Sequence, residues 1–98
     1  MYKPPYLLGI DSGTSACKVV LFTLDGKIVE KTSVEHKVYH PKPDWAEQDP
    51  KEWWMATVQA IETLLKKSRV KSEDIIGLSV DSQREAVVAL DKEGNVLC

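Results

Sequence analysis

The alternation of apolar and polar positions predicts three strands in the first third of the chain. Residues 6–10 and 16–24 form apolar runs rich in β-formers, and residues 27–35 alternate apolar with polar side chains. Asp25-Gly26 separates the second and third strands and is a strong hairpin signal. Gly13-Thr14-Ser15 separates the first and second strands in the same way. Because this small-residue turn leads into a strand, it is unlike a Rossmann or Walker-type loop, which leads into a helix.

One helix is predicted, from residue 49 to about residue 67. Asp49 suits the N-cap, Pro50 suits the first turn, and Glu52 stands three residues after Asp49, in the spacing of a capping box. Apolar residues repeat at helical spacing and predict a face that packs on a sheet. This face comprises Trp54, Val58, Ile61 and Leu65, widened by Trp53, Thr57 and Leu64. Residues 36–50 hold three of the five prolines and predict an extended connector.

The last third of the chain predicts two more strands. An apolar run at residues 75–80 is followed by a polar segment, a second run at 86–90 and a hairpin-like turn at 92–95. The predicted order is β-β-β-α-β-β, an α/β fold without internal repeats. Residues 96–98 read as the start of a further strand, so we expect the chain to be a fragment of a longer protein.

The composition describes one ordinary soluble domain. The chain has 98 residues, of which 43% are hydrophobic and 29% charged, and its formal net charge is −2. This balance gives no bulk attraction to nucleic acid or to acidic membranes. Because no apolar run approaches the ~20 residues that span a bilayer, and no secretory signal is present, we expect a cytoplasmic protein. Cys17 and Cys98 make no disulfide framework and have no partners at metal-ligand spacing.

Asp11 and the Gly-Thr-Ser turn (residues 13–15) suit the binding of a phosphate and its metal ion. Small residues let backbone N–H groups approach phosphoryl oxygens, as Gly13, Thr14 and Ser15 allow. Asp11 at a strand end can hold Mg²⁺ through its waters, and Lys18 can bring a positive charge to the same place. The alternative is an ordinary tight turn beside a capping aspartate, and these residues alone do not separate the two interpretations.

The Gln-Arg-Glu segment (residues 83–85) suits a polyhydroxyl compound. Gln83, Arg84 and Glu85 combine an amide, a planar donor fork and a carboxylate acceptor, which together match adjacent hydroxyl groups. The segment follows Asp81 at the end of an apolar run, and open α/β sheets bind ligands at such strand ends. The alternative is a solvated turn with an internal Arg-Glu ion pair.

The tryptophans and histidines carry less information. A tryptophan can stack on a sugar, but Trp53 and Trp54 stand at core spacing on the predicted helix, so core packing is the favoured interpretation for them and for Trp45. His36 and His40 have no acidic or cysteine neighbours at ligand spacing, and we assign them no role.

Three segments together resemble the N-terminal part of the FGGY carbohydrate kinases. They are Leu8-Gly9-Ile10-Asp11-Ser12-Gly13-Thr14-Ser15-Ala16-Cys17-Lys18, then Pro43-Asp44-Trp45-Ala46-Glu47-Gln48-Asp49-Pro50 before Trp53-Trp54, and Gly77-Leu78-Ser79-Val80-Asp81-Ser82-Gln83-Arg84-Glu85. The resemblance runs the length of the chain, and three motifs in order are more specific than one. It implies the first of two actin-like (ribonuclease H-like) domains that close on ATP and a sugar or polyol. Residues 1–98 would be the N-terminal portion of that first domain, without the second.

The resemblance also implies roles for the matched residues. Asp11 would sit by the Mg²⁺–phosphate group, the Gly-Thr-Ser turn would line the first phosphate hairpin, and Lys18 would replace an arginine that glycerol kinases have there. Gln83-Arg84-Glu85 would be the counterpart of the segment that holds glycerol. The family's catalytic aspartate, second phosphate hairpin and adenosine pocket lie beyond the last residue. No residue of this chain is therefore expected to be catalytic.

The identity of the substrate stays open. Trp-Ala-Glu-Gln-Asp-Pro followed by Trp-Trp is closer to xylulokinases, but these carry Gln-Met-His-Gly in place of the Gln-Arg-Glu segment. The leading hypothesis is an ATP-dependent kinase of a small sugar or polyol that forms a homo-oligomer. The fragment alone is expected to be inactive, because it lacks the base and the adenosine pocket.

Two other classes of protein are alternatives. One is an actin- or chaperone-like ATPase module that acts on a protein partner and whose first hairpin also reads Asp-x-Gly-Thr. The Gln-Arg-Glu segment favours the kinase over this class, since a protein-remodelling ATPase needs no hydroxyl-binding cluster beside its phosphates. The other is a stand-alone binding module that keeps the fold without turnover.

Overall fold

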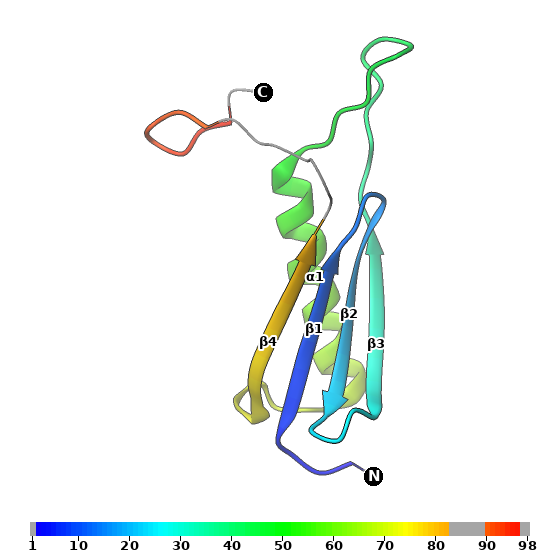
Figure 1. Cartoon of the computed structure of the whole chain (residues 1–98), viewed down its shortest axis with the longest axis vertical. Helices are drawn as coiled ribbons and strands as arrows, with labels where there is room; N and C mark the ends of the chain where they lie inside the picture. The colour runs from blue at the N-terminus through cyan, green and yellow to red at the C-terminus, as the bar shows by residue number, and fades with distance from the viewer. Residues whose placement is uncertain (1, 83–89, 97–98) are drawn as a thin grey trace.

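The computed structural model describes residues 2–82 and 90–96, which form one mixed sheet with a helix on one face (Figure 1). The sheet has four strands in the order β3-β2-β1-β4. The elements are β1 (Tyr6–Ser12), β2 (Ala16–Thr23), β3 (Ile28–Glu35), α1 (Pro50–Ser68), the short 3₁₀ helix η1 (Ser72–Asp74) and β4 (Ile75–Ser82). The predicted order is confirmed up to β4.

The first three strands form an antiparallel meander, as the alternation predicted. The Asp25-Gly26 turn joins β2 to β3, with Gly26 at a φ of +88° and the Thr23 N–H donating to the Lys27 carbonyl at 2.9 Å. A positive φ is readily adopted by glycine, which explains its place in this turn. The Thr23 hydroxyl donates to the Asp25 carboxylate and lowers the pKa of Asp25.

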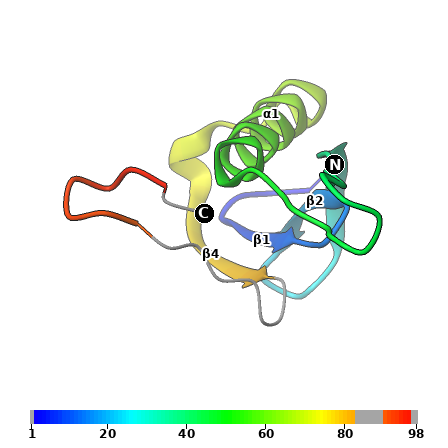
Figure 2. The same cartoon turned by 90° about the horizontal axis from the view of Figure 1, so that it is seen from above.

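Helix α1 returns the chain so that β4 can pair in parallel with β1. The helix lies on one face of the sheet and packs mainly against β2 and β3 (Figure 2). Beneath it lie side chains from alternate positions of the first two strands, because successive strand residues point to opposite faces. The buried core consists of Tyr6, Leu8, Ile10, Cys17, Val19, Leu21, Ala56, Ala60 and Leu64.

The buried face of α1 differs from the predicted one. Its centre is Ala56, Ala60 and Leu64, whereas Trp54 is 67% exposed. The alanines let the helix backbone approach the sheet so closely that the Thr32 hydroxyl of β3 donates to the Ala60 carbonyl at 2.8 Å. The prediction counted only large apolar side chains and therefore centred the buried face on the side of Trp54. A close contact between helix and sheet requires small residues instead.

The start of α1 follows the sequence signals only in part. Asp49 is the N-cap, and its carboxylate accepts the Lys51 N–H at 2.9 Å. Glu52 accepts a hydrogen bond from the Tyr39 hydroxyl, which raises the pKa of Tyr39, so its carboxylate ties the helix to the preceding segment. The described residues include no bond from the Glu52 carboxylate to the Asp49 N–H, so the predicted capping box is not completed.

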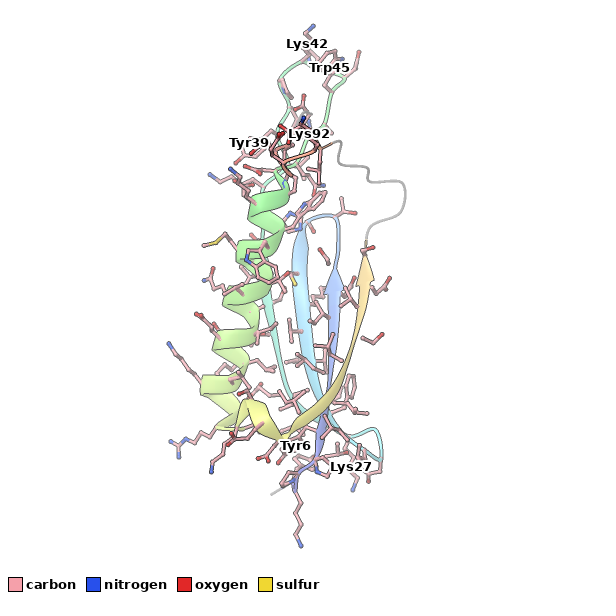
Figure 3. The ribbon with its side chains drawn as sticks, turned by 90° about the vertical axis from the view of Figure 1, so that its left-hand side faces the viewer. Tyr6, Lys27, Tyr39, Lys42, Trp45 and Lys92 are labelled. Atoms are coloured by element: carbon pink, nitrogen blue, oxygen red, sulfur yellow. The ribbon has the colours of Figure 1, made fainter. Side chains whose placement is uncertain are left out.

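The segment before α1 is a hairpin rather than the predicted extended connector. Tyr39 and Glu47 form an antiparallel bridge, and a tight turn between them is closed by the Trp45 N–H and the Lys42 carbonyl at 2.9 Å. This projecting hairpin (residues 37–49) extends beyond the sheet, and Lys42 lies over the Trp45 ring near its tip (Figure 3). The prolines shape its turn instead of keeping the segment extended.

The predicted fifth strand falls mostly outside the described residues. Leu90 and Val96 form an antiparallel bridge around a turn in which Gly94 has a φ of +87°, and this confirms the hairpin-like turn. The Asn95 N–H donates to the Asp91 carboxylate at 2.8 Å, and this bond lowers the pKa of Asp91. Within residues 2–82 and 90–96, no helix is long and apolar enough to span a membrane.

The packing of α1 leads to a prediction about stability. Leu64 is fully buried between α1 and the sheet, so Leu64→Ala should lower the free energy of unfolding by about 2–5 kcal/mol through lost burial and a new cavity. Chemical denaturation followed by circular dichroism measures this change. The matched control is Glu62→Ala on the exposed side of the same helix, and equal losses in the two variants would contradict the observed helix orientation.

Candidate functional site

Three charged residues on adjacent strands lie in one row near the carboxyl end of β1. The row crosses β4, β1 and β2. Asp11 of β1 pairs with Asp81 of β4 in parallel register and with Lys18 of β2 in antiparallel register. Residues paired in register share a face of the sheet. Since Ile10 is buried beneath α1, this row lies on the face opposite the helix, and all three side chains are exposed.

An irregularity in the β1–β4 pairing sets this alignment. Tyr6 pairs with Ile75 but Leu7 pairs with Gly77, so Ile76 is an extra residue in β4. With continuous register, Asp11 would stand opposite Val80, and Asp81 would lie on the face that α1 occupies. A one-residue shift moves every later side chain to the other face. The bulge therefore places both carboxylates side by side on the open face.

A shallow cavity of about 320 Å³ lies beside this row. Its lining includes Gly9, Asp11, Lys18, Phe22, Ser79 and Asp81. At Gly9 a Cβ would lie 3.3 Å from Cε2 of Phe22, so a larger residue there would crowd the Phe22 ring. The predicted site residues Asp11 and Lys18 thus meet at one place with Asp81.

The two aspartates have the chemistry of a magnesium site. Within residues 2–82 and 90–96 neither carboxylate accepts a hydrogen bond or forms an ion pair, and the salt bridges found there are Lys27–Asp25 at 3.8 Å and Lys67–Glu30 at 3.6 Å. Two adjacent carboxylates repel each other, and a cation bound next to them stabilises their charged forms. Mg²⁺ typically takes one or two carboxylates from a protein and fills its other positions with water and phosphate oxygens, so a pair of carboxylates is a sufficient donor set for it.

The Gly-Thr-Ser turn lies at the same end of the sheet, directly after β1 (Figure 1). The Gly13 N–H donates to the Ala16 carbonyl at 2.9 Å and closes the hairpin, while Thr14 and Ser15 are exposed at its tip. A Cβ on Gly13 would stand 3.1 Å from that same carbonyl oxygen, which is backbone and cannot move aside. Close backbone approach is therefore the reason for glycine at this position.

His36 contacts this turn, although no pattern in the sequence indicated the contact. One ring nitrogen, Nε2, lies 2.9 Å from the Gly13 carbonyl oxygen, and the His36 backbone N–H donates to the Ser15 carbonyl at 3.0 Å. The contact spans 23 residues and arises because β3 ends beside the start of β2. Residue spacing along the chain could not have indicated it.

The remaining candidates are the Gln-Arg-Glu segment and the tryptophans. Gln83, Arg84 and Glu85 lie outside the described residues, directly after Asp81-Ser82 at the end of β4. Of the tryptophans, Trp53 is half-buried and its indole N–H donates to Gln48 at 2.7 Å. The predicted core packing is wrong for Trp54 and for Trp45, which is 51% exposed in the projecting hairpin.

Comparison with known proteins identifies the family of the chain. The sequence pattern of the FGGY family of carbohydrate kinases, N-terminal domain, matches residues 6–98. A glycerol kinase of Leptospira biflexa serovar Patoc is 36% identical over 93 residues, which are 95% of this chain and 19% of that protein. The crystal structure of a xyloylose kinase from Brucella ovis superposes with a TM-score of 0.90 at 34% identity, over 95% of this chain and 20% of that one.

A third similar structure is a gluconate kinase from Lactobacillus acidophilus, with a TM-score of 0.88 and 30% identity over 98% of this chain and 19% of that one. The fold is that of the actin-like ATPases, and the chain belongs to the FGGY family of carbohydrate kinases. It spans about a fifth of the length of these relatives.

Proposed function

We propose that the protein carrying this chain is an ATP-dependent phosphotransferase that acts on a hydroxyl group of a small sugar or polyol. The observation that carries the proposal is the alignment of Asp11 with Asp81 beside the Gly-Thr-Ser turn. Membership of a carbohydrate kinase family supports the same reaction class. Phosphoryl transfer depends mainly on positioning and charge compensation, and these residues offer both.

Each group of residues has a part in this proposal. Asp11, with Asp81 beside it, would hold Mg²⁺, and the ion would supply charge neutralisation for the phosphates. The N–H and hydroxyl groups of the exposed residues Thr14 and Ser15 donate hydrogen bonds to phosphate oxygens. Lys18 adds a positive charge on the same face as Asp11. Its ammonium group is a point charge and lacks the planar fork with which an arginine binds phosphate in a bidentate way.

Gln83, Arg84 and Glu85 bind the hydroxyl groups of the acceptor in this proposal. They follow β4 directly, so the acceptor segment begins at the strand end that carries Asp81. The relatives are kinases named for glycerol, xyloylose and gluconate, which are small polyhydroxyl compounds. We leave the choice among such acceptors open, and the cytoplasmic location and homo-oligomeric state stay predictions.

The role of Asp11 is tested by kinetics on the full-length protein. We expect Asp11→Asn to lower kcat about 100-fold or more, because metal-held charge is worth several kcal/mol in the transition state, while sugar affinity stays close to that of the unchanged protein. The matched control is Asp25→Asn, which changes an exposed carboxylate in the β2–β3 turn at the opposite end of the sheet (Figure 1). An unchanged kcat in Asp11→Asn would remove this residue from the mechanism.

The acceptor segment gives a second kinetic prediction. Arg84→Ala leaves acceptor hydroxyls without a donor, so acceptor binding should weaken by about 1–3 kcal/mol while ATP binding changes little. Calorimetry with a panel of polyols and ketoses measures both affinities. Arg69→Asn is the control, since it removes the other arginine from a left-handed position, φ 60°, that asparagine tolerates. Equal losses for nucleotide and acceptor in Arg84→Ala would reject the assignment.

A further inference from the structure

The Gly-Thr-Ser turn lacks the positive φ that is favoured in two-residue hairpin turns. Two-residue hairpin turns fit the twist of their strands when one or both central residues have a positive φ. Among the described residues, positive φ occurs only at Gly26, Arg69 and Gly94, so Thr14 and Ser15 do not supply it. The β2–β3 turn, in contrast, has Gly26 at +88°. The bond from the Gly13 N–H to the Ala16 carbonyl at 2.9 Å closes the hairpin, and contacts from outside the turn add to it.

His36 supplies two such contacts. Its ring Nε2 bonds the Gly13 carbonyl at 2.9 Å, and its backbone N–H donates to the Ser15 carbonyl at 3.0 Å. A carbonyl only accepts, so Nε2 carries the ring proton. The other ring nitrogen, Nδ1, is buried without a hydrogen-bond partner among the described residues, consistent with its being the unprotonated one. The hydrogen bond of the His36 ring among the described residues is therefore the one to the Gly13 carbonyl.

The direction of the Gly13 carbonyl decides where the next amide points. The peptide bond between Gly13 and Thr14 is trans, because the cis bond among the described residues is Pro4-Pro5. In a planar trans peptide the C=O and N–H groups point in opposite directions. When His36 holds the Gly13 carbonyl, the Thr14 N–H therefore points away from the histidine.

We infer that His36 is the positioning residue of the Gly-Thr-Ser turn, holding the Gly13 carbonyl so that the Thr14 N–H faces the nucleotide phosphates. This inference rests on the proposed function, in which the turn binds phosphate. His36 itself touches neither the nucleotide nor the acceptor. It acts by fixing a donor before the ligand arrives, so no ordering cost is added on binding.

The direct test observes the peptide that joins Gly13 to Thr14. Gly13-Thr14 is the one Gly-Thr pair in the 98 residues. In full-length protein labelled with ¹³C at glycine carbonyls and ¹⁵N at threonine, an HNCO spectrum reports that carbonyl and that amide in one peak, assigned by its loss in Thr14→Ser. His36→Ala should move the carbonyl resonance upfield, since a hydrogen bond to it is lost, and His36→Gln should restore it through the glutamine N–H.

Kinetics on the same variants test the second step. His36→Ala should raise KM for ATP about 2- to 10-fold, the range of one lost hydrogen bond, with KM for the acceptor unchanged and partial recovery in His36→Gln. His40→Ala is the matched control, because His40 makes the same kind of bond, from Nδ1 to the Trp45 carbonyl at 3.0 Å, in the projecting hairpin. It should alter neither the peak nor KM for ATP.

The HNCO spectrum and the KM for ATP test different steps of the inference. An unmoved Gly13 resonance in His36→Ala overturns the positioning role, whatever the kinetics show. A moved resonance with unchanged KM for ATP overturns the inference that the held amide serves the nucleotide. The proposed function fails separately, through an unchanged kcat in Asp11→Asn.

Discussion

The extra residue Ile76 in β4 is the constraint on which the site depends. It shifts the parallel pairing with β1 by one position, so that Asp81 stands beside Asp11 instead of beside Ser12. Because the side-chain period of a strand is two, the same shift sets Gly77, Ser79 and Asp81 on the open face. One bulge thus converts two separate strand-end carboxylates into a pair that can share a cation.

The rest of the fold maintains this pairing. Helix α1 returns the chain from β3 to β4, and it is held on the sheet by small residues at its buried face and by the bond from Thr32 to the Ala60 carbonyl. At its start, Asp49 caps the helix and Glu52 is tied to Tyr39 of the projecting hairpin. The other side of the site is fixed by the end of β3, where His36 reaches the Gly-Thr-Ser turn.

Local signals in the sequence were enough to predict the elements and part of the site. Asp25-Gly26 predicted its hairpin because the turn needs a positive φ, and Asp49 predicted the cap because its carboxylate meets a free N–H. The apolar run at residues 75–80 predicted β4 and placed Asp81 at the end of a strand. These inferences required only neighbours in the chain.

Features that depend on distant contacts were not predictable in this way. The helix face was predicted only in part: Ile61 and Leu64 do pack on the sheet, but Ala56 and Ala60 were missed because they carry little hydrophobic weight, although close packing selects them. The bulge at Ile76 has no local marker, since β-branched residues suit either register. His36 gave no pattern at all, because its partners Gly13 and Ser15 lie on the other side of two strands.

In the proposed function, Asp11 and Asp81 act together on one cation. A double-mutant cycle of Mn²⁺ affinity, measured with ADP present by electron paramagnetic resonance, tests it most directly. We expect Asp11→Asn and Asp81→Asn each to weaken Mn²⁺ binding, and the double variant to lose less than the sum, with a coupling of about 0.5–3 kcal/mol. Unchanged Mn²⁺ affinity in Asp81→Asn, or losses that add, would contradict the account.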